Sequence, residues 1–320
     1  MKNQIRALAV ALCLCATLAQ AVPPYFKWER SNCWLDVGFQ MVCGMPKLVR
    51  FLADPRNEQE MIEKIRRRPQ ESEEWCKKEN RSFTAEDKQR IVKEGEQEIA
   101  FIAALADLVR KIQAEPEKQH SLDRLHQLVD PNAYVKSSPE DPMKLFDHIF
   151  SPSVLSRAIG DKLRLRTERS DLFTFHTYFD SGSPLEEQLR GEKITHLGPY
   201  LILVYNHLGK SPVQVPPVPL KVAFDNHEFE LILVDVVRGE SHHWAYIKDQ
   251  HEKEPSWYKS NDISHAPRKA DPKEINDEWK TKGVLPRFLI YKLVESPLVI
   301  GLKNFSDSLD ALRRQLVSKK

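Results

Sequence analysis

The sequence has little glycine, few cysteines and no excess of charge of one sign. Only 11 of its 320 residues are glycine, which argues against a linker-rich or low-complexity chain. No C-x-x-C pair occurs anywhere, so we do not expect a structural zinc ribbon. The composition, 41% hydrophobic and 29% charged, is typical of a globular protein with one large domain or two small ones.

The charge balance excludes a generic nucleic-acid binder. The chain has 48 basic and 46 acidic residues, and two of the basic ones, Lys2 and Arg6, lie in a segment at 1–21 that contains no acid. Without that segment the two signs are equal in number, whereas a nonspecific nucleic-acid binder carries a basic excess. We therefore expect no nucleic-acid partner.

The first 21 residues have the pattern of a secretory signal peptide. A short positive start precedes the apolar run Ala7–Leu18, and Ala19-Gln20-Ala21 is a small-residue cleavage site. The apolar run is shorter than the about 20 residues of a membrane span, and no later segment is long and apolar enough for one. We expect a secreted mature chain that begins at Val22 and has no membrane span; an uncleaved anchor or a buried helix is the alternative.

The pattern of elements predicts an α+β fold, with a helical first half followed by strands. A helix is expected over 32–42, with Asn32 as capping residue and Gly44 as its end, and Thr84–Asp87 resembles a capping box before a long helix to about Glu115. Further helices are expected at 122–129, 143–150 and 304–320. Strands are expected at 200–205, 213–215, 221–224, 229–237, 244–248 and 288–293, with a further strand segment over 256–262.

An odd number of cysteines remains once the signal segment is removed. Cys33, Cys43 and Cys76 are left, so at least one thiol has no partner within the chain and deserves inspection as a reactive group. Cys33 lies at the predicted start of a helix, where the helix dipole favours a thiolate. A bridge between Cys43 and Cys76 would leave Cys33 as the free thiol. The alternative is that Cys33 is a buried core residue with no chemical role, since free cysteine is common in cores.

Two neighbouring strand segments offer the partners that a thiolate nucleophile needs. His242 and His243 stand at the entry of one strand, and Asn261 and Asp262 at the end of the next. A base and a group that orients it are required for this chemistry, and the order Cys, His, Asn/Asp is that of papain-like thiol hydrolases. The alternative is a pair of histidines in a surface turn.

The sequence around these residues resembles the ubiquitin-specific proteases. Cys33–Val42 is similar to the family's Cys box, with Asp36 where the family has Asn. Ser241–Tyr246 and Trp257–Asp262 resemble its His box and its Trp-Tyr-Lys-Phe-Asp-Asp box. Four further segments occur in the family's order: Asp141–Phe146, Ser183–Leu189, Gly198–Leu203 and Phe229–Val237.

The resemblance implies an enzyme and a role for each matched residue. Cys33 would be the nucleophile of a deubiquitinase, His242 the base, Asn261 the orienting group and Asp262 a supporting acid. His242 is preferred over His243 because its spacing to Ala245 and Tyr246 matches the box. The reaction implied is hydrolysis of an isopeptide or peptide bond at the carboxyl terminus of ubiquitin or a ubiquitin-like protein, through a thioester and without a cofactor.

The resemblance also implies a papain-like architecture over residues 22–303. A helical thumb would span about 22–165 and an antiparallel β palm about 166–300, with reduced fingers that lack the family's Cys pairs. The family's oxyanion donor, an Asn five residues before the nucleophile, is replaced by Trp28. Asn32 or backbone N–H groups would have to stabilise the oxyanion instead.

Three functions are therefore in competition. The first is a secreted deubiquitinase. Because the signal segment looks bacterial and ubiquitin is not a bacterial substrate, such a protein would be an effector that acts inside a eukaryotic host cell. The second is a ubiquitin-binding module with impaired catalysis, suggested by Trp28 and Asp36. The third is an exported thiol peptidase without ubiquitin specificity.

Overall fold

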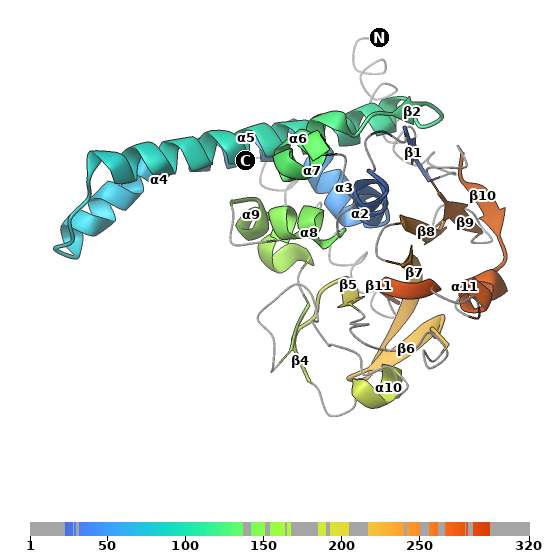
Figure 1. Cartoon of the computed structure of the whole chain (residues 1–320). Helices are drawn as coiled ribbons and strands as arrows, with labels where there is room; N and C mark the ends of the chain where they lie inside the picture. Colours follow the sequence, from blue (N-terminus) through green and yellow to red (C-terminus); the bar gives the residue numbers. More distant parts are fainter. Residues whose placement is uncertain are drawn as a thin grey trace, which may run out of the picture.

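The computed structural model describes most of the chain between residues 23 and 294. The described residues are 23–27, 29, 32–136, 142–150, 154–163, 165–167, 185–189, 193–204, 217–239, 242–249, 256–261, 266–278, 280 and 284–294. They form a helical region and an antiparallel sheet that pack against each other (Figure 1).

The sheet is built around two long central strands. These are β7 (His227–Arg238) and β11 (Val284–Leu293). The others are β5 (Tyr200–Val204), β6 (Lys221–Phe224), β8 (His242–Lys248), β9 (Trp257–Ser260) and β10 (Arg268–Ala270). Their order is β10–β9–β8–β7–β11–β5, with β6 beside the first half of β7, and every pairing is antiparallel.

Side chains of the sheet alternate between two hydrophobic cores. On β8, Ala245 and Ile247 belong to the core shared with the helices, whereas Trp244 and Tyr246 belong to the core on the opposite face. This is the period of two that a strand imposes. Consecutive residues at the start of β8 therefore point to different sides of the sheet.

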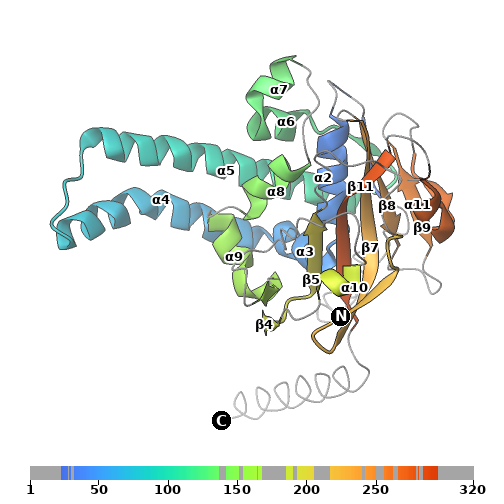
Figure 2. The same ribbon diagram turned by 60° about the horizontal axis from the view of Figure 1, so that its bottom comes forward.

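A central helix, α2 (Cys33–Cys43), lies on the helical face of the sheet. All of its residues from Cys33 to Val42 are buried, as expected for a helix that is apolar around most of its circumference. It lies alongside the strands (Figure 2). At Gly38 a Cβ atom would stand 3.3 Å from Leu145 Cδ2, so the absence of a side chain lets the neighbouring helix approach closely.

Two long helices form an arm that extends away from the sheet. They are α4 (Pro55–Lys78) and α5 (Ala85–Ala114), which run side by side (Figures 1 and 2). Met61 and Ile65 are the buried residues of α4, and the first buried residue of α5 is Gly95. The arm beyond Ile65 and Gly95 thus contains no buried side chain among its described residues.

The remaining elements are short. The helices are α3 (Pro46–Ala53), α6 (Asp123–Val129), α7 (Pro131–Lys136), α8 (Met143–Phe150), α9 (Val154–Leu163), α10 (Leu185–Gln188) and α11 (Pro272–Glu278). Two small ribbons pair β1 (Tyr25–Phe26) with β2 (Gln119–His120) and β3 (Arg166–Thr167) with β4 (Ile194–His196). The first of these ribbons holds the chain just before α2.

The expected α+β class is confirmed as a mixture of helices and an antiparallel sheet. The helix predicted at 143–150 and the strand predicted at 221–224 have the predicted bounds. The capping box at Thr84 is confirmed, and the helix after it ends at Ala114. Three strands begin earlier than predicted, β7 at His227, β8 at His242 and β11 at Val284, because cross-strand pairing continues through polar residues and a proline.

Several expectations concern residues that the structure does not describe. The predicted signal peptide, Trp28, Asp262, the strand at 213–215 and the helix at 304–320 all lie outside the described residues. The bridge considered between Cys43 and Cys76 is absent, and both are thiols. Cys43 ends the central helix, whereas Cys76 lies near the far end of α4, so a bridge would have to join the body to the arm.

Neither a membrane-spanning helix nor a metal cluster is found in the part of the chain that the structure describes. No described helix combines the length and the apolarity needed to cross a bilayer. The described His, Cys, Asp and Glu residues form no group of three or more that could hold a metal ion.

The capping box makes a prediction about the arm. Thr84 Oγ1 accepts the Asp87 N–H at 3.1 Å, and Asp87 Oδ2 accepts the Thr84 N–H at 3.1 Å. Thr84→Ala should lower the free energy of opening of the first turns of α5 by about 1 kcal/mol, measured by amide hydrogen exchange. Thr84→Ser keeps the hydroxyl and should cost much less; an equal loss in both variants would contradict the role of the cap.

Candidate active site

Cys33 is the first residue of α2, and the chain before it is held firmly. The Lys27 N–H donates to the His120 carbonyl at 2.9 Å, and Gln119 Nε2 donates to the Phe26 carbonyl at 3.1 Å. These bonds extend the β1–β2 ribbon and fix the entry to the helix. The Cys33 side chain is only 2% exposed.

Asn32 stands at the N-cap position but does not cap α2. Its Oδ1 accepts the Glu29 N–H at 3.0 Å, and its Nδ2 donates to the Lys27 carbonyl at 3.0 Å. The expectation of a side-chain cap is therefore wrong, because the preceding turn competes for the carboxamide. Asn32 holds the turn before Cys33, with one Nδ2 hydrogen directed at a backbone oxygen.

A buried glutamine fastens α2 to the sheet. Gln40 Nε2 donates to Ser260 Oγ on β9 at 3.2 Å and to the Pro24 carbonyl, and it lies 3.4 Å from Asp36 Oδ1. Gln40 and Ser260 are 1% and 3% exposed. One amide thus joins the helix, the sheet and the amino-terminal segment away from water.

The position of α2 along the strands determines which strand residues lie at the same height as Cys33. Gly44 lies next to Leu233, which pairs with Ile247, and Gln40 contacts Ser260, which pairs with Ala245. The helix therefore runs in the same direction as β8. From Gln40 back to Cys33 the helix covers seven residues at about 1.5 Å each. From Ala245 back to His242 the strand covers three residues at about 3.3 Å each, so both lengths are about 10 Å. The start of α2 and the start of β8, with its two histidines, accordingly lie at the same end of the sheet.

His242 begins β8 and is held from the next strand. It pairs with Arg238 on β7, and the Asn261 side chain, directly after β9, forms a hydrogen bond with its imidazole. Its Nε2 is buried and has no hydrogen-bond partner. This arrangement leaves a ring nitrogen ready to accept a proton.

The electrostatic surroundings favour the neutral form of His242. Burial, the largest cause, lowers the pKa of the imidazole below its ordinary value of 6.5, and the hydrogen bond with Asn261 opposes that shift. The charges of His243, Arg238 and Lys259 lower the pKa further. A neutral imidazole near pH 7 is the form that a general base requires.

His243 points to the other face of the sheet, towards α2, and forms a second polar pair. Its Nδ1 lies 3.1 and 3.2 Å from the two carboxylate oxygens of Asp235, and the side chains are 6% and 0% exposed. No role for Asp235 was predicted from the sequence. An acid inside the otherwise apolar strand 229–237 was the available signal, since a buried carboxylate requires a partner.

The structure therefore gathers most of the expected residues at one end of the sheet. Cys33 lies at the same end of the sheet as the histidines, and Asn32 is bonded to the turn before Cys33. His242 contacts Asn261 on the face of β8 away from α2, whereas His243 lies on the face towards α2. Asp262 lies outside the described residues. The two adjacent histidines serve opposite faces of the strand.

Comparisons with known proteins give a likeness of fold. No protein-family model and no curated protein matches the sequence. An essential yeast splicing factor has a similar structure, with a TM-score of 0.50 and 13% identity over 86% of this chain and 70% of that one. At this identity the likeness shows a shared fold and no shared activity.

Two structures of Pan2 from Saccharomyces cerevisiae are also similar. They show its pseudoubiquitin hydrolase–RNA exonuclease module with AAGGA and with AAUUAA RNA. The TM-scores are 0.41 and 0.42, the identities 11% and 13%, and each match covers 61% of this chain. This chain spans about half of the length of those Pan2 chains, 47% in each case.

The buried pair of His243 and Asp235 yields a stability prediction. Asp235→Ala leaves a buried imidazole without its acceptor, which should lower the free energy of unfolding by about 1–3 kcal/mol. Asp235→Asn keeps an oxygen that accepts a hydrogen bond and should lose less. Urea unfolding at pH 7 compares the two, and a larger loss in Asp235→Asn would contradict the hydrogen-bond explanation.

Proposed function

We propose that this protein is a thiol-dependent hydrolase that cleaves isopeptide or peptide bonds at the carboxyl terminus of ubiquitin or a ubiquitin-like protein. Cys33 acts as the nucleophile, His242 as the base and Asn261 as the group that orients the imidazole. The proposal includes a papain-like arrangement with the helices of residues 33–163 on one side and the strands of residues 200–293 on the other.

The hydrogen bond between His242 and Asn261, at the end of the sheet where α2 begins, carries the proposal. The proposal requires the His242 imidazole, on the face of β8 away from α2, to reach Cys33 past the end of the strand. The hydrogen bond joins two strands that are neighbours in the sheet, and it leaves His242 Nε2 without a partner. A thiol at a helix start, a neutral imidazole and an orienting carboxamide are the three groups that thiol hydrolysis needs. Ubiquitin as the substrate rests on the resemblance of the Cys box and the His box.

The chemistry follows from these roles. His242 takes the proton of the Cys33 thiol, and the sulfur bonds to the carbonyl carbon at the carboxyl terminus of the substrate. The carbon–nitrogen bond then breaks, and the amine leaves with the proton from the imidazolium. Water, deprotonated by His242, attacks the thioester, the carbon–sulfur bond breaks, and the thiolate recovers its proton. Backbone N–H groups at the start of α2 act as the donors for the oxyanion.

A ubiquitin-binding module without turnover is the second candidate. Cys33 is 2% exposed, and the Asn32 carboxamide donates to a backbone carbonyl. Loss of one oxyanion donor costs about 3–4 kcal/mol of barrier. Such a protein would bind ubiquitin reversibly and form no thioester.

Secretion belongs to the same proposal and has its own test. The sequence of residues 1–21 has the pattern of a signal peptide. Amino-terminal sequencing of the exported protein should begin at Val22. A protein that retains Met1 and stays with the cell would contradict this part of the proposal alone.

Covalent capture distinguishes the candidate functions. A ubiquitin whose carboxyl terminus carries an electrophile should become attached to the wild type and to Cys43→Ala, but not to Cys33→Ala. Reversible binding without attachment would favour the binding module. Cleavage of small peptides with no cleavage of di-ubiquitin would favour a peptidase without ubiquitin specificity.

The two histidines should differ in kinetic importance. Loss of a general base typically costs about 10²–10⁴-fold, so His242→Ala should lower kcat/KM for a ubiquitin amide substrate by that factor. His243→Ala should retain much of the activity, since its imidazole is bound to Asp235. The reverse ranking in matched, folded variants would show that His243 is the base.

The pH profile reports the environment of His242. The base acts in its neutral form, and burial lowers its pKa below 6.5, so the acid limb of kcat/KM should lie below that pH. Asn261 raises this pKa, so Asn261→Ala should move the limb to still lower pH. A limb above pH 6.5, or a shift towards higher pH in the variant, would contradict the assignment.

A further inference from the structure

The far half of the α4–α5 arm exposes surface that the fold itself does not use. No described side chain of the arm beyond Ile65 and Gly95 is buried. Trp75 is 50% exposed there, and an ion pair between Lys88 and Glu73 at 3.0 Å links the two helices. Since the side chains of this part of the arm are not packed into the core, their surface is available to a partner.

A pocket of about 610 Å³ lies between the two helices of the arm and reaches α9. Four arginines line it, Arg68, Arg81, Arg90 and Arg157, against two acids, Glu71 and Asp87. A second pocket of about 380 Å³ shares Arg68, Glu71 and Arg157 and adds Lys64. The two pockets share three lining residues, and we call them together the arm groove; more basic than acidic residues line it.

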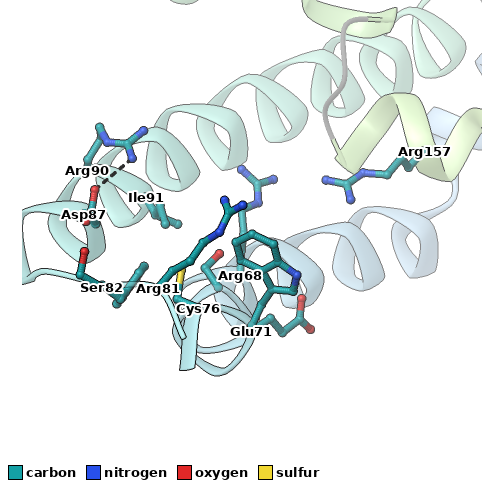
Figure 3. A pocket seen from close by; sticks show the side chains of 12 residues that line it. Arg68, Glu71, Cys76, Arg81, Ser82, Asp87, Arg90, Ile91 and Arg157 are labelled. Atoms are coloured by element: carbon teal, nitrogen blue, oxygen red, sulfur yellow. Dashed lines mark hydrogen bonds and ion pairs between the residues drawn. The ribbon is translucent and has the colours of Figure 1, made fainter. Parts of the chain in front are cut away.

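Three guanidinium groups are turned towards the same space in the arm groove. Figure 3 shows those of Arg68, Arg81 and Arg157 directed inward from three different elements. Like charges that converge repel one another unless an anion lies between them. Planar guanidinium groups match carboxylates in a bidentate geometry.

Two of the four lining arginines have acidic partners among the described residues. Arg68 pairs with Glu98 at 2.6 Å, and the other oxygen of Glu98 accepts the Val154 N–H at 2.7 Å. Asp87 is 3.3 Å from Arg90 and also serves the capping box. Arg81 lies over the Trp75 ring at 5.0 Å and forms no ion pair with any described residue.

We propose that the arm groove binds an acidic peptide segment of a partner protein. Carboxylates of the segment pair with Arg68, Arg81 and Arg157, and an apolar side chain packs on the exposed part of Trp75. This interaction is separate from the chemistry at Cys33 and does not depend on it.

The lining favours a peptide over a nucleic acid. Glu71 and Asp87 interrupt the basic residues, so the evenly spaced phosphates of an RNA strand would meet carboxylates in the groove. A peptide can place its acids at the arginines and neutral residues elsewhere. An apolar side chain of the peptide can also pack on Trp75, a contact that a nucleic acid would make by stacking a base.

Binding to an array of 12-residue peptides tests the proposal. The array combines Asp and Glu with Leu, Phe and neutral positions, and the best peptide is then titrated by fluorescence anisotropy against the full-length protein. Arg81→Glu should weaken binding at least about tenfold, because it replaces a charge-assisted contact by repulsion. Trp75→Ala should weaken it as well, and added salt should weaken binding to the wild type.

A matched variant separates the groove from net charge. Arg66 is exposed on α4, the helix that precedes Arg81 in the chain, and does not line either pocket, so Arg66→Glu makes the same change of charge outside the groove. It should retain binding. Circular dichroism of both variants checks that the arm remains helical.

The position of Cys76 gives a second measurement. Cys76 lines the groove, so bound peptide should slow its alkylation, measured by mass spectrometry, without slowing that of Cys43. The proposal is overturned if no acidic peptide binds, if Arg66→Glu weakens binding as much as Arg81→Glu, or if oligouridylate RNA binds more tightly than every peptide.

Discussion

The seating of one buried helix on the sheet determines where every candidate active-site residue lies. Gln40 joins α2 to Ser260 and to the Pro24 carbonyl, all of them out of contact with solvent. Unsatisfied polar groups are costly in such surroundings, so the amide fixes the helix in one position along the strands. That position brings the start of α2, and with it Cys33, to the end of the sheet where β8 begins.

The strand period then divides the polar groups at that end into two sets. His242 and Asn261 form one, and His243 and Asp235 form the other on the face towards the helix. The first combines a neutral imidazole with an orienting amide, which suits proton transfer. The second is enclosed and paired, which suits the support of the helix above it. Neighbours in sequence thereby acquire different environments from the geometry of the strand alone.

Much of this arrangement could be predicted from the sequence. Apolar runs and turn residues located β5, β6 and β7, and the capping box located α5, because these signals are local. The helix α4 was not predicted, since its charged sequence with Pro69 inside has little apolar periodicity. The Asn32 bonds and the Asp235 pair were also missed, because both depend on which backbone or strand lies opposite, and no local pattern contains that information.

The alternation at the start of β8 also ties the choice of histidine to the register of the strand. A slip of β8 by one residue would move every one of its side chains to the other face of the sheet. The two imidazoles would exchange places, but Trp244 and Tyr246 would then stand in the core of Ala245 and Ile247. The two hydrophobic cores therefore fix which histidine lies beside Asn261 and which lies beside Asp235.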